Sequence, residues 1–328
     1  MLNELTNQAA QLTICDGVKY RSLEMFALVD GNPAAEPGYV TLEEAIASGA
    51  ARVTEVSASG SVPELLFHNE GSLPVLLLDG EELIGAKQNR VLNLTILAPA
   101  RSKIVIPVSC VEAGRWRMAS EEFRASPQMM YSRLRAEKVE QVTCCLRTEM
   151  GRMSDQAAVW EDLAAKAERL DAASPTGAMS EVFARNKIRV EEFERAFSLA
   201  PGQVGVAYRI GGRQWGVDLF DHARTMERYW KKLLRSYALD AIDEEQEAEK
   251  PAEPEEVRRL FERVAAGTAF CEQSPGLGKD VRMTAEGLSG AGLWVEGRYV
   301  HFCAFSRNGG NGGRLKTRMS MPSRRRVF

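Results

Sequence analysis

Histidine is scarce in this chain of 328 residues, which contains only His68, His222 and His301. None of them stands at metal-ligand spacing from a cysteine or a carboxylate, so the sequence predicts no metal site. Mechanisms that carry protons on an imidazole also have few candidates. In YVHFCAF, His301 alternates with aromatic residues, which is typical of a histidine in a core or an interface.

The cysteines are scattered and do not form the pattern of a disulfide framework. A reducing cytoplasm is therefore the setting we predict. Cys110 invites an interpretation as a nucleophile, because Arg115 nearby would lower the pKa of its thiol. The alternation of apolar residues from Ile104 to Val108 instead places Cys110 on a buried face, where cysteine behaves as a small apolar residue, and this interpretation is favoured.

Long apolar runs are also missing. No stretch approaches the roughly 20 residues that a membrane-spanning helix needs. The first residues, MLNELTNQAAQLTICDG, lack the basic start and apolar core of a signal peptide. A net charge of -3 gives no overall attraction to nucleic acid or to an anionic membrane. We expect a cytoplasmic protein with no membrane segment.

Charge is unevenly placed along the chain. Residues 240–256, DAIDEEQEAEKPAEPEE, are acidic and contain prolines, which predicts a solvated linker or surface excursion. Residues 307–328 are glycine-rich and then basic, which predicts a flexible tail. Such a tail either solvates the terminus or contacts RNA or another polyanion.

Residues 1–125 have the pattern of strands separated by turns. A short helix is marked by a capping box of Thr41 and Glu44. Pro107 predicts an edge strand or a strand end, because proline donates no ladder hydrogen bond. Clusters of Gly, Pro, Asn and Ser separate the apolar runs. The predicted strands are residues 51–56, 64–68, 74–78, 91–97 and 104–108, a density that indicates an antiparallel sandwich or a partly open barrel.

Residues 126–239 change to a mainly helical pattern. Apolar residues recur at helical spacing from Ser126 onward, and two more amphipathic helices are predicted at 155–170 and 180–200. VGVAYRI and QWGVDLF, separated by GGR, predict a short hairpin. Residues 257–306 predict a helix and up to three strands that return to the first sheet. The fold class is therefore α+β, a β-rich layer covered by several amphipathic helices.

Polar side chains are concentrated between residues 73 and 116, around three apolar runs. Arginine can bind a phosphate through a bidentate fork, and amides can meet ribose hydroxyls or a base edge. A glutamate can accept from ribose hydroxyls or act as a general base if burial raises its pKa. The residues concerned are Glu81, Glu82, Lys87, Gln88, Asn89, Arg90, Glu112, Arg115 and Trp116, the last placed to stack on an adenine.

Two other interpretations of this cluster remain open. Its members could instead form a buried polar network that locks two strands together, and Glu82 and Lys87 taken singly have the pattern of a solvated face. Farther along, GLGKDVR precedes a strand and lacks the full phosphate-loop pattern, so a nucleotide P-loop is rejected. Asp280 and Arg282 within it either bind a ligand or form a cross-strand ion pair. Gln156 and Trp160, four residues apart on one helical face, either contact a ligand together or are a solvent-facing amide and a core tryptophan, and the second interpretation is favoured.

The motifs GEELIGAKQNRVLN, IPVSCVEAGRW, QAAVW, GLGKDVR and VHFCAF resemble the family of ARG and rhodanese-phosphatase-superfamily-associated proteins. ARG stands for ADP-ribosylglycohydrolase, and the name records gene neighbourhood. The resemblance covers most of the chain and implies the metabolism of NAD-derived ADP-ribose. Ala157 stands where the family motif leads us to expect glycine, so a close approach of the backbone is not implied there.

Three functions follow from these observations. The first is binding or processing of an ADP-ribose or other NAD-derived nucleotide, with hydrolysis as one form of processing. Here Arg90, Gln88 and Asn89 bind the ligand together with Arg115, Trp116, Asp280 and Arg282, and Glu81 or Glu112 is the acid–base group. The second is a noncatalytic partner or regulatory protein. The third is an RNA-binding accessory protein that uses the basic tail. No motif names a cofactor or decides whether the protein is an enzyme.

Overall fold

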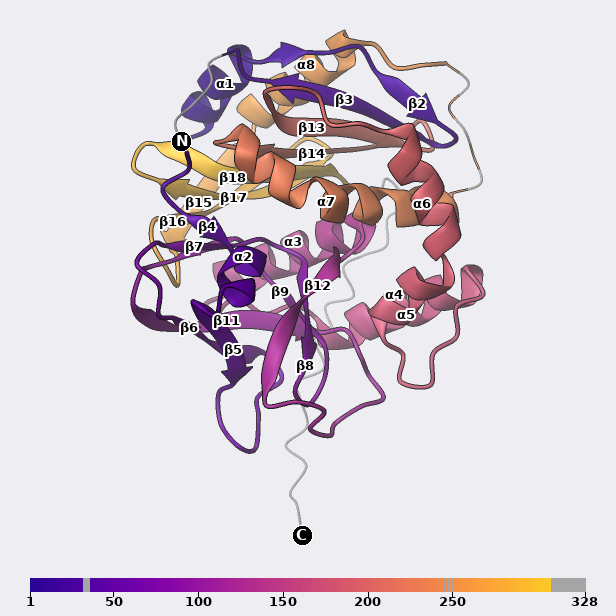
Figure 1. Cartoon of the computed structure of the whole chain (residues 1–328). Helices are drawn as coiled ribbons and strands as arrows, with labels where there is room; N and C mark the ends of the chain where they lie inside the picture. The colour runs from indigo at the N-terminus through magenta and orange to yellow at the C-terminus, as the bar shows by residue number, and fades with distance from the viewer. Residues whose placement is uncertain (32–35, 245, 247, 249, 308–328) are drawn as a thin grey trace.

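A closed barrel and a large antiparallel sheet form the two main layers of the computed structural model, with helices between and around them (Figure 1). The structure describes all residues except 32–35, 245, 247, 249 and 308–328. The predicted α+β class is confirmed. No described helix has the length and apolar content to cross a membrane. The predicted tail falls on residues 307–328, nearly all of which lie outside the described residues.

The barrel is built from a continuous part of the chain and contains most of the strands predicted there. Its interior is apolar, with residues such as Val53, Phe67 and Leu92 fully buried. In barrel order the strands are β11 (Ser102–Cys110), β6 (Glu64–Asn69), β5 (Ala51–Glu55), β12 (Glu122–Met129), β8 (Glu81–Gly85) and β9 (Arg90–Leu92).

Pro107 lies within β11 and not on an edge, because the barrel is closed. Up to Pro107, β11 pairs with β6, and from Val108 it pairs with β9. The proline therefore marks the point at which one strand changes partners, where a missing N–H costs the ladder little. The predicted strand 91–97 is likewise two strands, β9 and β10 (Ile96–Ala98). The second joins a small sheet with β7 (Val75–Leu77) and β4 (Val40–Thr41).

The large sheet combines the beginning and the end of the chain. The last strands lie in one sheet with strands from residues 13–29 and not in the barrel, which is closed and offers no free edge. These strands extend the predicted hairpin, which pairs with β3 (Leu23–Val29). In chain order the sheet contains β1 (Thr13–Ile14), β2 (Val18–Tyr20), β3 (Leu23–Val29), β13 (Gln203–Ile210), β14 (Gln214–Phe220), β15 (Thr268–Gln273), β16 (Lys279–Ala285), β17 (Leu288–Val295) and β18 (Arg298–Ser306).

Helices cover both faces of the large sheet. Two of them, α1 (Leu2–Ala10) and α8 (Pro254–Ala265), pack on the face away from the barrel. On the other face α3 (Ser132–Arg147) and α7 (Ala223–Asp243) lie between the sheet and the barrel and share one core with both (Figure 1). The remaining helices are α2 (Leu42–Ala47), which has the predicted capping box, α4 (Gln156–Arg169), α5 (Met179–Arg185) and α6 (Lys187–Ala196).

Two predicted boundaries differ from the structure. The helix expected from Ser126 begins at Ser132, because β12 continues to Met129. The acidic segment begins inside α7, and its first residue, Asp240, is buried because it accepts hydrogen bonds from Lys166 and Ser132. The run of acidic residues therefore predicts a start for the linker that lies inside α7.

Candidate functional site

Six of the predicted ligand-binding and catalytic residues meet at one end of the barrel. Residues 85–90 connect β8 to β9, and residues 111–116 follow β11. Because β9 pairs with both β8 and β11, Arg90 stands opposite Leu83 on one side and Cys110 on the other. This barrel-end site consists of Gln88, Asn89, Arg90, Glu112, Arg115 and Trp116.

Glu112 joins the two segments of the barrel-end site. Its carboxylate accepts hydrogen bonds from the Asn89 backbone N–H at 3.1 Å, from Arg115 Nε at 2.9 Å and from Thr176 Oγ1 at 2.9 Å. Burial opposes the charged form, but these hydrogen bonds lower the pKa of Glu112 below its ordinary value. Glu112 is therefore an ionised positioning group and is poorly suited to donate a proton.

Arg115 is also committed to the protein itself. Its Nη1 donates to the Ala86 carbonyl at 2.7 Å, and its Nη2 donates to Asn89 Oδ1 at 3.0 Å and to the Gly85 carbonyl at 3.2 Å. Gly85 and Ala86 have positive φ angles of 138° and 39°. For the non-glycine Ala86 such a backbone angle is unfavourable. Arg115 holds this turn in place.

Arg90 is fully buried, yet one edge of its guanidinium has no hydrogen-bond partner. Nη1 donates to Gln88 Oε1 at 3.1 Å and to the Asn89 carbonyl at 3.4 Å. Nε and Nη2 have no partner among the described residues. These two nitrogens form the side of the guanidinium that binds two oxygens of a phosphate or carboxylate. Burial lowers the pKa of Arg90.

One aromatic and one acidic side chain lie near the Arg90 guanidinium. The Trp116 ring lies 5.7 Å from Arg90 Cζ and 5.4 Å from Lys87 Nζ, and 49% of Trp116 is exposed. The charge of Glu55 stabilises the charged form of Arg90. Glu55 Oε1 accepts from the Lys87 backbone N–H, whereas its buried Oε2 has no partner among the described residues. Sequence reasoning missed Glu55, which is distant from the motif along the chain.

Cys110 is a buried packing residue, as predicted. Burial raises the pKa of its thiol, and Arg90 only partly offsets this effect. Gln156, expected to face solvent, instead accepts from the Cys110 N–H at 2.7 Å and donates to the Cys110 carbonyl at 2.8 Å. The Gln156 side chain of α4 therefore takes the place that a neighbouring strand would have beside the Cys110 N–H and carbonyl groups.

Glu82 does not lie on a solvated face as predicted, since it is 1% exposed. Ser126 Oγ donates to its Oε2 at 2.8 Å, and its Oε1 has no partner among the described residues. Burial raises the pKa of Glu82 to about 7. Because neighbouring residues of a strand face opposite sides, Glu82 points away from the side of β8 that Leu83 shares with Arg90.

Glu81 and the GLGKDVR residues lie outside the barrel-end site. Glu81 forms an ion pair with Lys232 of α7 at 2.9 Å. Asp280 and Arg282 lie on β16 of the large sheet, where Arg282 Nε is 2.8 Å from Asp280 Oδ1. Arg152 Nε donates to the other Asp280 oxygen at 3.0 Å. The structure therefore separates these three residues from the six that meet at the barrel end.

A second cluster of buried charges joins the barrel to the large sheet. Arg135 of α3 donates to both oxygens of Asp218 at 3.0 and 2.7 Å, and its Nε reaches Asp79 at 3.4 Å. Lys138, one turn along α3, also contacts Asp79. His301 lies 2.8 Å from Thr95 Oγ1 and 3.2 Å from Asp218 Oδ1. We call these six residues the interlayer network: Asp79, Thr95, Arg135, Lys138, Asp218 and His301.

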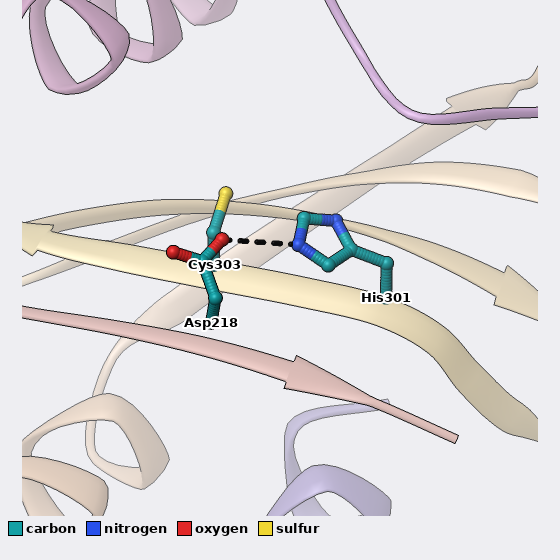
Figure 2. Close-up of side chains that lie close together, drawn as sticks. All are labelled: Asp218, His301 and Cys303. Carbon is teal, nitrogen blue, oxygen red and sulfur yellow. Dashed lines mark hydrogen bonds and ion pairs between the residues drawn. The ribbon is translucent and has the colours of Figure 1, made fainter. Parts of the chain in front are cut away.

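Asp218, His301 and Cys303 have the composition of a metal-ligand set. Their ligand atoms lie within 4.8 Å of one another, on adjacent strands β14 and β18 (Figure 2). Arg135 and Tyr237 already donate to the Asp218 carboxylate. Burial raises the pKa of the Cys303 thiol, which opposes the thiolate that a metal needs. The arrangement therefore fits an ion-pair network better than a metal centre.

The charge balance of Asp218 supports this assignment. Burial alone would raise its pKa, but Arg135 and His301 hold it well below its usual range. Sequence analysis missed the network, although Arg135 and Lys138 stand three residues apart among buried residues of α3. Charges on the apolar side of a predicted helix were the available signal.

Comparison with known proteins adds a family to this geometry. No curated protein and no solved structure matches the chain. The pattern of the ARG and Rhodanese-Phosphatase-superfamily-associated Protein domain matches residues 11–305, which include the barrel, the large sheet and the helices between them. The protein therefore belongs to the ARG and Rhodanese-Phosphatase-superfamily-associated Protein domain family.

Proposed function

We propose that the barrel-end site binds an ADP-ribose-type nucleotide through Arg90. The observation that carries this proposal is the free Nε and Nη2 edge of a fully buried guanidinium. A buried charge without a paired anion is costly, so such an edge is suited to an oxyanion supplied by a ligand. A phosphate offers two oxygens at the spacing of these two nitrogens.

The neighbours of Arg90 match the other parts of such a ligand. Trp116 offers an exposed ring face on which an adenine stacks. Glu55 Oε2 is an acceptor without a partner among the described residues, and it suits the paired hydroxyls of a ribose. The Trp116 ring lies 5.7 Å from Arg90 Cζ, so a stacked base would lie close to a phosphate held by the guanidinium.

The roles proposed for the motif residues differ from one another. Arg90, Trp116 and Glu55 contact the nucleotide. Gln88, Asn89, Glu112 and Arg115 position Arg90 and the turn beside it, because their hydrogen bonds are made within the site. Since the Glu112 carboxylate is already occupied by hydrogen bonds from Asn89, Arg115 and Thr176, the function proposed is binding.

Isothermal titration with ADP-ribose, NAD and AMP tests the proposal. Arg90→Gln removes the free edge and should weaken binding of ADP-ribose by about thirtyfold, the equivalent of a charged hydrogen bond of about 2 kcal/mol. The matched control is Arg258→Gln, because Arg258 is an exposed arginine of α8. Absence of heat with all three nucleotides, for a protein that circular dichroism shows to be folded, would contradict the proposal.

A noncatalytic partner protein is the second candidate, and one observation favours it. Trp116 and Met118 are 49% and 52% exposed, and they follow one another closely along the segment after β11. Exposed large apolar side chains of this kind are typical of protein contacts. Copurification of a partner that is lost in Met118→Ser but retained in Arg90→Gln would support this function over nucleotide binding.

A further inference from the structure

A cleft of about 640 Å³ lies between α3 and the large sheet, apart from the barrel-end site. Its floor is a row of side chains on neighbouring strands. Tyr208 of β13 faces Gly216, which pairs with Phe305, and Phe305 pairs with Ser289. Volumes between about 300 and 1,000 Å³ are typical of pockets for small molecules. The cleft is therefore large enough for a ligand the size of a nucleotide.

Two buried hydroxyl groups line this cleft without a partner. The Oη of Tyr208 and the Oγ of Ser289 have no hydrogen-bond partner among the described residues, and these residues are 2% and 3% exposed. Ser132, also on the wall, donates its hydroxyl to Asp240 and interacts with the Tyr208 hydroxyl only outside hydrogen-bond geometry. Leaving a buried hydroxyl unsatisfied costs free energy, so two of them in one cleft favour a ligand with polar groups.

The position of Tyr208 is fixed by a glycine. A Cβ at residue 216 would lie 2.3 Å from the Tyr208 ring, so only glycine allows the ring to lie across β14. The ring also stacks on Tyr237, with centroids 3.9 Å apart. The hydroxyl is therefore held at the floor of the cleft.

The rim of the cleft carries one arginine without a carboxylate partner. Glu140 pairs with Arg307, and Glu137 pairs with Arg133. Arg147, at the end of α3, has no carboxylate partner among the described residues. Its guanidinium lies 5.1 Å from the centre of the Phe270 ring and reaches Thr284 Oγ1 at 3.5 Å. Ala136, Ile210 and Met283 give the cleft apolar walls.

We propose that this cleft binds a small planar heteroaromatic molecule with a single anionic group, the chemistry shared by nucleoside monophosphates and heteroaromatic carboxylates. The ring lies between the apolar wall and Phe305, polar groups of the ligand bond to Tyr208 and Ser289, and the anion lies at Arg147. This site is additional to the barrel-end site and does not depend on it.

Cys144 provides a local probe of occupancy, because it lines the cleft and is exposed. The experiment measures the rate at which iodoacetamide alkylates Cys144 in the full-length protein. Cys15, which follows β1 and lies outside the cleft, is the internal reference. The probes are AMP, adenosine, which lacks the anion, ribose 5-phosphate, which lacks the base, and pyridine-3-carboxylate. AMP, pyridine-3-carboxylate or both should slow alkylation of Cys144 at least fivefold and leave Cys15 unchanged. Protection by only one of these two probes shows whether the cleft accepts a nucleoside monophosphate or a heteroaromatic carboxylate.

Variants test the residues assigned to the ligand. Tyr208→Phe and Ser289→Ala each remove one hydroxyl and should weaken protection by roughly two- to tenfold, the range for one hydrogen bond. Arg147→Gln should weaken it by at least fivefold. Tyr299→Phe is the matched control, because Tyr299 has a buried hydroxyl without a partner among the described residues but lies in the core on the opposite face of the sheet.

Several outcomes would overturn this proposal. It is wrong if neither AMP nor pyridine-3-carboxylate slows alkylation of Cys144, or if Tyr208→Phe and Ser289→Ala both bind like the unaltered protein. Equal protection by adenosine and AMP would overturn the role of Arg147. Arg90→Gln should leave protection of Cys144 unchanged. That variant separates failure of the cleft from failure of the barrel-end site.

Discussion

The barrel-end site and the interlayer network each bury an arginine completely, and they differ in what surrounds the guanidinium. Arg135 donates to two carboxylates of the network, one of them through a bidentate pair. Arg90 has no carboxylate partner among the described residues and leaves two nitrogens unbonded there. The two guanidinium groups are thus equally buried, but Arg135 is fully hydrogen-bonded to carboxylates and Arg90 is not. The comparison teaches that a buried arginine paired with carboxylates has a structural role, whereas one with neither a carboxylate partner nor a full set of hydrogen bonds indicates a place for a ligand.

The largest expected effect is on the saturated side. Asp218→Ala leaves Arg135 as a buried charge with only the weaker contact to Asp79, and it should lower the free energy of unfolding by about 3–5 kcal/mol. Urea denaturation followed by circular dichroism measures this loss. Arg258→Ala, which breaks an exposed pair with Glu255, should cost about 0.5 kcal/mol or less. A loss below about 1 kcal/mol for Asp218→Ala would remove the structural role of the network.

A second expected effect concerns a carboxyl group that belongs to neither cluster. Burial raises the pKa of Glu82 from 4.5 to about 7, so the folded protein keeps a proton that the unfolded chain releases between these values. The contribution of Glu82 to stability is complete below about pH 4.5 and is lost as pH rises through about 7. A shift of this size corresponds to on the order of 3 kcal/mol.

Glu82→Gln keeps an acceptor for Ser126 and removes the titration. We expect the stability of the variant relative to the unaltered protein to rise from about pH 5 to about pH 8, as measured by urea denaturation at each pH. Parallel pH profiles for the two proteins would show that Glu82 is ionised in the folded state. Such a result would also show that a buried carboxylate oxygen without a hydrogen-bond partner, such as Glu82 Oε1, does not by itself indicate a raised pKa.

The smallest expected effect sharpens the comparison most directly. Arg90→Met replaces an unpaired buried charge with an apolar side chain of similar length, and it should change the free energy of unfolding by no more than about 1 kcal/mol, with a gain as the favoured sign. Arg135→Met should destabilise the protein by several times as much, because Asp218 and Asp79 lose their partner. Both are measured by urea denaturation. Equal losses in the two variants would mean that Arg90 has the same structural role as Arg135.

The sequence predicted that the residues of the barrel-end site lie together, because they are close along the chain. Residues 88–90 lead into β9, and residues 112–116 follow β11, which pairs with β9, so the pattern of strands and turns along the sequence was enough to bring them together. The same local pattern predicted most barrel strands. Their alternation of apolar and polar residues reflects a single buried face.

Glu81 and Glu82 show where this reading fails. Both faces of β8 are buried, so alternation along the strand carries no information about which glutamate faces which neighbour. Glu81 contacts α7, which begins more than a hundred residues later, and Glu82 contacts Ser126 of β12. Asp218 and His301 were missed for the same reason, since their partners come from α3 and the barrel. Only the tertiary fold decides these pairings.

The pairing of β3 with β13 has a consequence for synthesis of the chain. The sequence of β3, LEMFALV, pairs on one edge with β1 and β2, but β13, its partner on the other edge, emerges only with residues 203–210, roughly 10–35 s later at the usual rates of translation. All barrel strands lie between these two strands in the sequence, so the barrel can close while β3 still waits. During that interval one edge of an apolar strand remains unpaired. We therefore expect the N-terminal segment to be the part of the nascent chain that most needs a chaperone.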